Sequence, residues 1–95
     1  MYEYLLPVGT VVLLNGGKKK LVITGVLPTK EEKVYDYTGV TYPEGDFAGC
    51  MHFLFNHADI ENVIFRGYED KERESFLNLL EILTKRRKGE KNKGE

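Results

Sequence analysis

The first half of the chain alternates short apolar runs with clusters of turn residues, a pattern typical of β-strands. Residues 9–14 (GTVVLL) and 21–27 (LVITGVL) are rich in aliphatic and β-branched side chains, which favour pleated strands. The Asn-Gly-Gly sequence at residues 15–17 tolerates positive φ angles and therefore favours a tight turn. The pattern predicts a β-hairpin, with Gly25 marking a bulge or bend in its second strand.

Three further strands are predicted before residue 70. Residues 34–42 alternate with period two, and residues 62–66 (NVIFR) form an apolar run that stops at Gly67. Residues 47–55 are too short for periodicity to distinguish a strand from a helix, and we predict a strand that ends in MHFLF. The connections are expected to be a charged loop at residues 28–33, a proline turn at residues 43–46, and a helical turn or loop at residues 56–59.

The last third of the chain carries the one long helical pattern. Asp70 is a suitable N-cap, the basic residues 85–88 suit a helix C-terminus, and Gly89 is the predicted end. We therefore expect a single domain over residues 1–88 and a disordered charged tail over residues 89–95. The apolar stripe of this helix comprises Phe76, Leu79, Leu80 and Leu83.

These elements predict the α+β class. The fold should be a small antiparallel sheet or half-open barrel of about five strands, with one C-terminal helix that closes one side. An SH3-like barrel is one candidate topology. A chain of 95 residues can bury one modest core, and its strand order does not follow from the sequence.

The charge distribution narrows the class of partner. Residues 85–95 hold six basic and two acidic residues, a balance of +4, whereas residues 1–84 hold eight basic and thirteen acidic residues, a balance of -5. An acidic body argues against a broad nucleic-acid surface. Cys50 is the one cysteine, so no intrachain disulfide forms, and neither a signal peptide nor a membrane-spanning run is evident. We expect a cytoplasmic protein without membrane insertion.

No set of residues in the sequence indicates a catalytic, cofactor or metal site. Cys50 and His52 would share one face of a strand and could reach one metal ion, but zinc needs three or four ligands, and the sequence supplies no second cysteine or paired histidines. As a nucleophile, Cys50 would need a positioned base and an orienting group. His52 would lie on the same face, but nothing marks an oxyanion hole or a leaving-group site. The lysine-rich turn at residues 15–20 lacks the spacing of a P-loop. We therefore predict a protein that is not an enzyme, with no cofactor and no metal.

The tyrosines are the best candidates for a binding surface. The chain has six tyrosines and no tryptophan, and three of the tyrosines cluster around residues 34–42, where Asp36, Glu44 and Asp46 are their neighbours in sequence. Tyrosine is enriched in the cores of protein interfaces, so an acidic, aromatic surface suits a protein partner or a homodimer. The alternative is that these rings fill a small core. The predicted surface comprises Tyr35, Tyr37, Tyr42 and Tyr68.

Three sequence blocks carry a family resemblance. They are LPVGTVVLLNGGKKKLVITG at residues 6–25, YDYTGVTYPEG at residues 35–45, and FNHADIENVIFRGYEDKERESF at residues 55–76. Together they resemble a bacterial domain-of-unknown-function family that is encoded beside LXG-type toxins of the type VII secretion system in Gram-positive bacteria. The blocks consist of turn and strand signatures and contain no chemical motif.

The resemblance implies a cytoplasmic accessory protein. Neighbours of such toxins commonly serve as export chaperones or targeting factors that engage the helical N-terminal region of the toxin. The resemblance transfers no catalytic residues to this chain. Two alternatives stay open: a nucleic-acid-binding barrel that uses Lys18–Lys20 and the basic tail, and an immunity protein that blocks the C-terminal domain of the toxin.

Overall fold

The computed structural model describes residues 2–93, with side chains to residue 85. These residues divide into two compact units. One is Leu5–Tyr68, and the other joins residues 2–4 to residues 69–93. Each unit is described on its own below, and the single domain over residues 1–88 stays a prediction.

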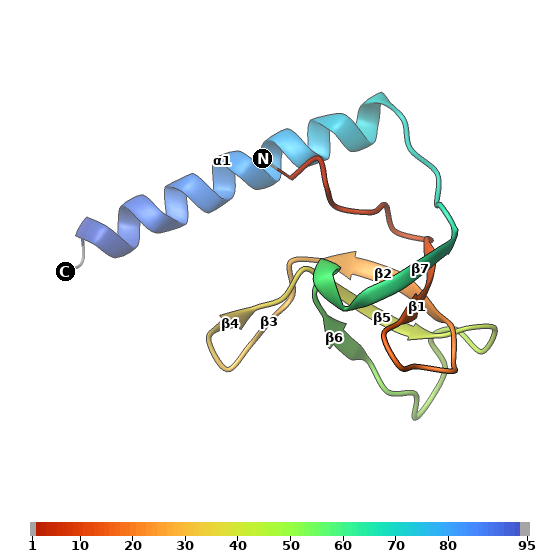
Figure 1. The fold of residues 1–95 in the computed structure, drawn as a ribbon. Coiled ribbons are helices and arrows are strands. Elements are labelled where there is room, and N and C mark those ends of the chain that lie inside the picture. The colour runs from red at the N-terminus through yellow and green to blue at the C-terminus, as the bar shows by residue number, and fades with distance from the viewer. Residues whose placement is uncertain (1, 94–95) are drawn as a thin grey trace. The chain divides into compact units, whose positions relative to one another are not determined.

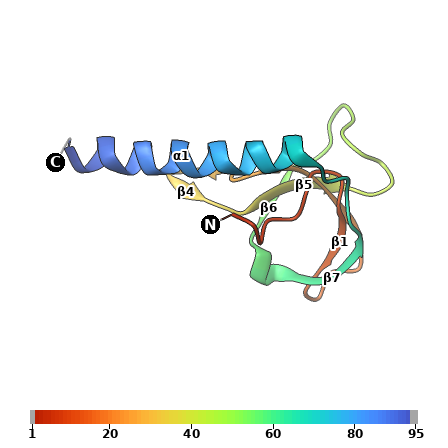
Figure 2. The same ribbon diagram turned by 90° about the horizontal axis from the view of Figure 1, so that it is seen from above.

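The first unit contains a five-stranded sheet whose neighbouring strands all run antiparallel. Its order is β6-β5-β2-β1-β7, so that the last strand returns to pair with the first, in agreement with the SH3-like candidate. The α+β class with about five strands is confirmed. From above, the strands curve around the core of this unit (Figure 2). The strands are β1 (Val11–Leu14), β2 (Leu21–Val26), β5 (Tyr37–Thr41), β6 (Phe53–Phe55) and β7 (Ile60–Phe65) (Figure 1).

The predicted hairpin forms between β1 and β2. Val11 pairs with Val22, and the turn is closed by the Gly17 amide, which donates to the Leu14 carbonyl oxygen at 2.9 Å. In the pairing of β2 with β5, the register shifts between Ile23 and Gly25. This irregularity confirms the predicted bulge.

The predicted charged loop at residues 28–33 is wrong. This segment forms a second, two-stranded hairpin of β3 (Thr29–Lys30) and β4 (Lys33–Val34), which extends from the sheet in Figure 1. Glu31 and Glu32 form its turn with φ angles of 53° and 66°. Two successive positive φ angles are typical of a hairpin turn, but Asn and Gly usually supply them, so the glutamates gave no signal.

The strand expected at the end of residues 47–55 is confirmed only over β6. Residues 42–52 form an irregular connection between β5 and β6, and therefore Met51 and His52 precede the strand. The helical turn expected after it is confirmed as the 3₁₀ helix η1 (His57–Asp59). The Asp59 carboxylate caps it by accepting from the Asn56 amide at 2.8 Å.

Tyr37 lies at the centre of the core of this unit. Its side chain is fully buried, and its ring centroid lies 5.5 Å from that of Phe55. The Leu6 amide donates to the Tyr37 hydroxyl at 3.0 Å, and the hydroxyl hydrogen is then available to His57 Nδ1 at 2.7 Å. The core also contains the buried side chains of Leu5, Leu6, Val12, Leu21, Ile23, Val40 and Phe55.

A close approach between segments requires glycine just after β7. The Gly67 amide donates to Oγ1 of the buried Thr10 at 3.0 Å. A Cβ atom at Gly67 would lie 2.6 Å from the Val8 carbonyl oxygen, a separation that real Cβ atoms essentially never show. β7 ends at Phe65, two residues before this glycine, close to the predicted end.

The second unit is built on α1 (Lys71–Lys93). Asp70 caps it as predicted, because its Oδ1 accepts from the Arg73 amide at 3.1 Å. The helix continues past Gly89, so the predicted end there is wrong. An interior glycine costs only about 1 kcal/mol, and the flanking residues favour helix. Residues 94–95 of the predicted tail lie outside the described residues. No helical segment in the described part of the chain is both long and apolar enough to cross a bilayer.

One flank of α1 is partly covered within its own unit. The Tyr2 hydroxyl donates to Thr84 Oγ1 at 2.9 Å, and Leu77 and Leu80 are half-buried. The other three members of the predicted apolar stripe are more exposed than Leu80, with Phe76 at 45%, Leu79 at 48% and Leu83 at 42%. That α1 closes one side of the sheet stays a prediction.

We expect Tyr37→Phe to lower the free energy of unfolding by about 1–3 kcal/mol, because the buried Leu6 amide loses its acceptor. Urea denaturation followed by circular dichroism measures this change. Tyr42→Phe removes a hydroxyl from a side chain that is 44% exposed, and as a control it should stay within about 0.5 kcal/mol of the unmodified protein. Equal stability of the two variants would contradict the role given to the buried hydroxyl.

Candidate functional site

The connection between β5 and β6 brings together three side chains that can bind a metal ion. Phe47 to Cys50 form a turn in which the Cys50 amide donates to the Phe47 carbonyl oxygen at 2.9 Å. Gly49 has a φ of 85° at the third position of this turn, the position where a type II turn requires glycine. The turn reverses the chain and returns Cys50 to Asp46, four residues earlier.

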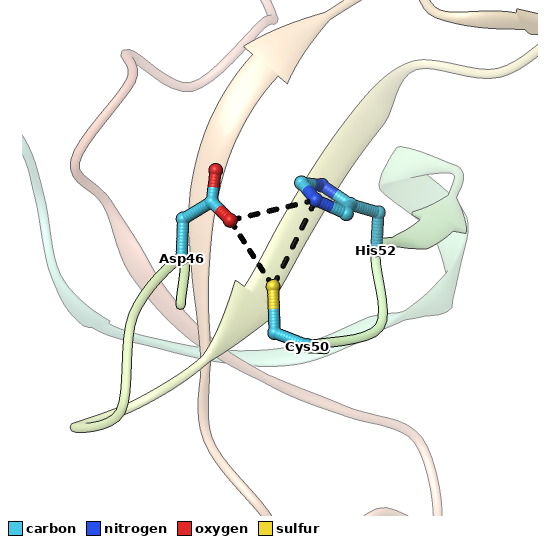
Figure 3. Close-up of side chains that lie close together, drawn as sticks. All are labelled: Asp46, Cys50 and His52. Atoms are coloured by element: carbon cyan, nitrogen blue, oxygen red, sulfur yellow. Dashed lines mark hydrogen bonds and ion pairs between the residues drawn. The ribbon is translucent and has the colours of Figure 1, made fainter. Parts of the chain in front are cut away.

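The three side chains converge on one point (Figure 3). Cys50 Sγ lies 3.1 Å from Asp46 Oδ1 and 3.8 Å from His52 Nε2, and His52 Nε2 lies 3.7 Å from Asp46 Oδ1. The Asp46 and His52 side chains are 66% and 52% exposed, while Cys50 is half-buried. A thiol, an imidazole and a carboxylate therefore meet at a position that solvent can reach. We call these three residues the DCH cluster.

The electrostatics of the DCH cluster argue against a nucleophilic cysteine. The hydrogen bond that Cys50 Sγ donates to Asp46 raises the pKa of the thiol, and desolvation and the negative charge of Asp46 add to the effect. Only the thiolate is a good nucleophile. At neutral pH the cysteine is thus held as a thiol, the opposite of what nucleophilic catalysis needs.

The sequence indicated two members of the DCH cluster and missed the third. Cys50 and His52 were expected to share one face of a strand, and that expectation is wrong because both precede β6. Asp46 was interpreted as a turn residue and as an acidic neighbour of the tyrosines, and not as a metal ligand. The signal that could have revealed it is the spacing D-x-x-x-C with a glycine before the cysteine, since such a turn returns the chain on itself.

The predicted tyrosine surface needs one correction. Tyr37 is fully buried and cannot contact a partner. Tyr42 and Tyr68 are 44% and 81% exposed, and Tyr35 is half-buried. The spatial neighbours also differ from the acidic neighbours in sequence: Lys33 Nζ lies 5.1 Å from the Tyr35 ring centroid, and Lys20 Nζ lies 5.9 Å from that of Tyr42.

A hollow of about 420 Å³ lies at the start of α1. Arg73 and Glu69 form an ion pair at 3.0 Å within its lining. Small-molecule sites are lined mainly by hydrophobic and aromatic side chains, whereas six of the seven residues that line this hollow are charged. It is lined by Glu3, Glu69, Asp70, Lys71, Arg73, Glu74 and Leu77.

Comparison with protein families identifies the chain. The family described as Domain of unknown function (DUF4176) matches residues 5–76. The chain belongs to this family. The match includes the whole sheet unit and the DCH cluster, and it stops six residues into α1. Neither the curated proteins nor the solved structures gave a match.

We expect Asp46→Asn to make Cys50 more reactive. The variant removes the carboxylate that accepts from the thiol, so the pKa of Cys50 falls and the thiolate fraction at neutral pH rises. Alkylation by iodoacetamide, followed across pH in the presence of a chelator, should be severalfold faster at neutral pH, with its midpoint at lower pH. Glu44→Gln changes a carboxylate in the same connection that pairs with Lys19 instead, and it should leave the rate unchanged. A slower or unchanged rate for Asp46→Asn would contradict this assignment.

Proposed function

We propose that this protein is a non-enzymatic accessory protein that binds a helical segment of another protein. The segment belongs to an LXG-type toxin exported by the type VII secretion system of a Gram-positive bacterium. The protein acts in the cytoplasm as a chaperone or targeting factor for this toxin. Membership of a domain-of-unknown-function family is consistent with the resemblance that suggests this role, but the toxin itself comes from the resemblance alone.

The observation that carries the proposal is the exposed apolar stripe of α1. Phe76, Leu79 and Leu83 follow one another at spacings of three and four residues, and Ile82 lies beside them with 52% of its side chain exposed. This spacing is the one by which an amphipathic helix packs against a second helix. Large exposed apolar patches mark interaction sites.

The N-terminal residues leave this stripe free within their own unit. Tyr2 contacts Thr84 on the flank that also carries Leu77 and Leu80, and this flank is half-buried. The neighbouring stripe is still 42–52% exposed. Within its unit, α1 therefore has apolar side chains that are only partly buried. A partner helix would bury the remaining apolar surface.

Burial of the apolar stripe would contribute a measurable free energy to the binding of a partner. Full burial of a leucine contributes about 1.5–3 kcal/mol. Leu79 and Leu83 are 48% and 42% exposed, so burying the remainder contributes on the order of 1 kcal/mol for each side chain. Replacing both should therefore weaken binding by roughly 30-fold, before the cost of burying a charge is added.

The structure gives observations both for and against the nucleic-acid alternative. Lysine ammonium groups lie near the Tyr35 and Tyr42 rings, and basic groups beside aromatic rings are typical of single-strand binding surfaces. However, Lys19 in the lysine-rich turn is paired with Glu44 at 3.0 Å, and residues 1–84 carry a balance of -5. We therefore rank this candidate second.

The test is recovery of the toxin by the tagged protein when both are expressed from their native operon. The unmodified protein should recover the helical N-terminal region of the toxin. Leu79→Glu with Leu83→Glu should reduce recovery by roughly 30-fold or more, because two charges replace the apolar stripe. Asn78→Glu is the matched control, since Asn78 is exposed on the same helix and is not a member of the apolar stripe.

The outcomes separate the candidates. Recovery of no toxin and no secretion component by the unmodified protein would overturn the proposal. Binding to the C-terminal domain of the toxin would indicate an immunity protein, and a salt-dependent shift of labelled RNA or DNA would indicate the nucleic-acid alternative. Equal loss of binding in Asn78→Glu would show that the stripe is not the contact.

A further inference from the structure

We propose that the DCH cluster, formed by Asp46, Cys50 and His52, is a binding site for a divalent cation of the zinc class. The site lies wholly within the sheet unit. It is independent of the proposed function, which rests on α1.

The spacing of the donor atoms fits tetrahedral coordination. Zinc binds sulfur at about 2.3 Å and nitrogen or oxygen at about 2.0–2.1 Å, so tetrahedral angles place sulfur about 3.6 Å from the other donors and nitrogen about 3.3 Å from oxygen. The corresponding distances here are 3.1 and 3.8 Å for sulfur, and 3.7 Å between nitrogen and oxygen. Each differs from the tetrahedral value by about half an ångström or less, and small side-chain rotations would close the difference.

The donor types select the class of metal. A thiolate and an imidazole suit zinc and its neighbours in the first transition row. Calcium and magnesium prefer oxygen ligands alone, and this cluster offers one carboxylate. Three protein ligands leave a fourth position for water or for a group from a partner.

The backbone holds the donors before a metal arrives. The Gly45 amide donates to the Thr41 carbonyl oxygen at 2.8 Å, and the turn at Gly49 returns Cys50 to Asp46. A preorganised site of this kind loses little conformational entropy when it binds.

Binding replaces one hydrogen bond by a coordinate bond. The S–H bond of Cys50 breaks, its proton passes to solvent, and the sulfur lone pair forms the bond to the metal, with no change of oxidation state. Asp46 and His52 then contribute oxygen and nitrogen to the same ion. The metal would join three points across seven residues and so stiffen a connection whose Phe47 and Met51 side chains are 52% and 69% exposed.

Cobalt(II) provides the direct test. The full-length protein, without a histidine tag, is stripped with a chelator, kept reduced with a phosphine and titrated with Co²⁺. We expect one equivalent to bind, with a near-ultraviolet thiolate-to-cobalt charge-transfer band and the intense visible bands of tetrahedral cobalt. Stoichiometric Zn²⁺ should then displace the cobalt and abolish these bands.

Variants assign the ligands. Cys50→Ser should remove the charge-transfer band, and Asp46→Asn and His52→Gln should each weaken binding by at least about 10-fold, since even loss of an outer-shell partner costs 10–100-fold. Glu44→Gln is the control and should bind as the unmodified protein does. No charge-transfer band in the unmodified protein, or equal weakening in Glu44→Gln, would overturn the proposal. The readout needs no partner, so failure here leaves the proposed function untouched, and the reverse also holds.

Discussion

The buried hydroxyl of Tyr37 is the interaction on which the sheet unit depends. It accepts from the Leu6 amide in the N-terminal segment and lies 2.7 Å from His57 Nδ1 in η1, while its ring packs near Phe55 on β6. One side chain on β5 therefore joins segments 31 residues before it and 20 residues after it. Burying a polar group without hydrogen-bond partners costs free energy. Tyr37 can therefore be buried only if the N-terminal segment and η1 both lie next to its hydroxyl.

The core around Tyr37 also determines where the DCH cluster forms. The side chains of the apolar core, among those described, all fall within residues 5–55. The same core fixes the end of β5 and the start of β6, and thus sets the span that residues 42–52 must cross. The DCH cluster forms within that span, where a glycine turn reverses the chain.

The sequence correctly predicted those parts of the fold that depend on residues close together in the chain. The hairpin turn, the bulge at Gly25 and the cap at Asp70 were recognisable because each needs a particular residue type at one position. Tyr37 was misassigned to a surface because a tyrosine is stable inside only when distant partners satisfy its hydroxyl, and those partners are not visible in a local pattern. Glu31 and Glu32 were missed because their turn uses residues that do not ordinarily mark one. Asp46 was missed because its role depends on a chain reversal that brings back a residue four positions later.

The Tyr37 hydroxyl holds the N-terminal segment against the core through its hydrogen bond from the Leu6 amide. Leu6 belongs to no strand, so the hydroxyl is the acceptor that should protect its amide from solvent exchange. Native-state hydrogen exchange of the Leu6 amide tests this most directly. This amide should exchange only through global unfolding, as slowly as the central amides of β2 and β5. Exchange as fast as that of the exposed amides at Lys18–Lys20 would contradict it.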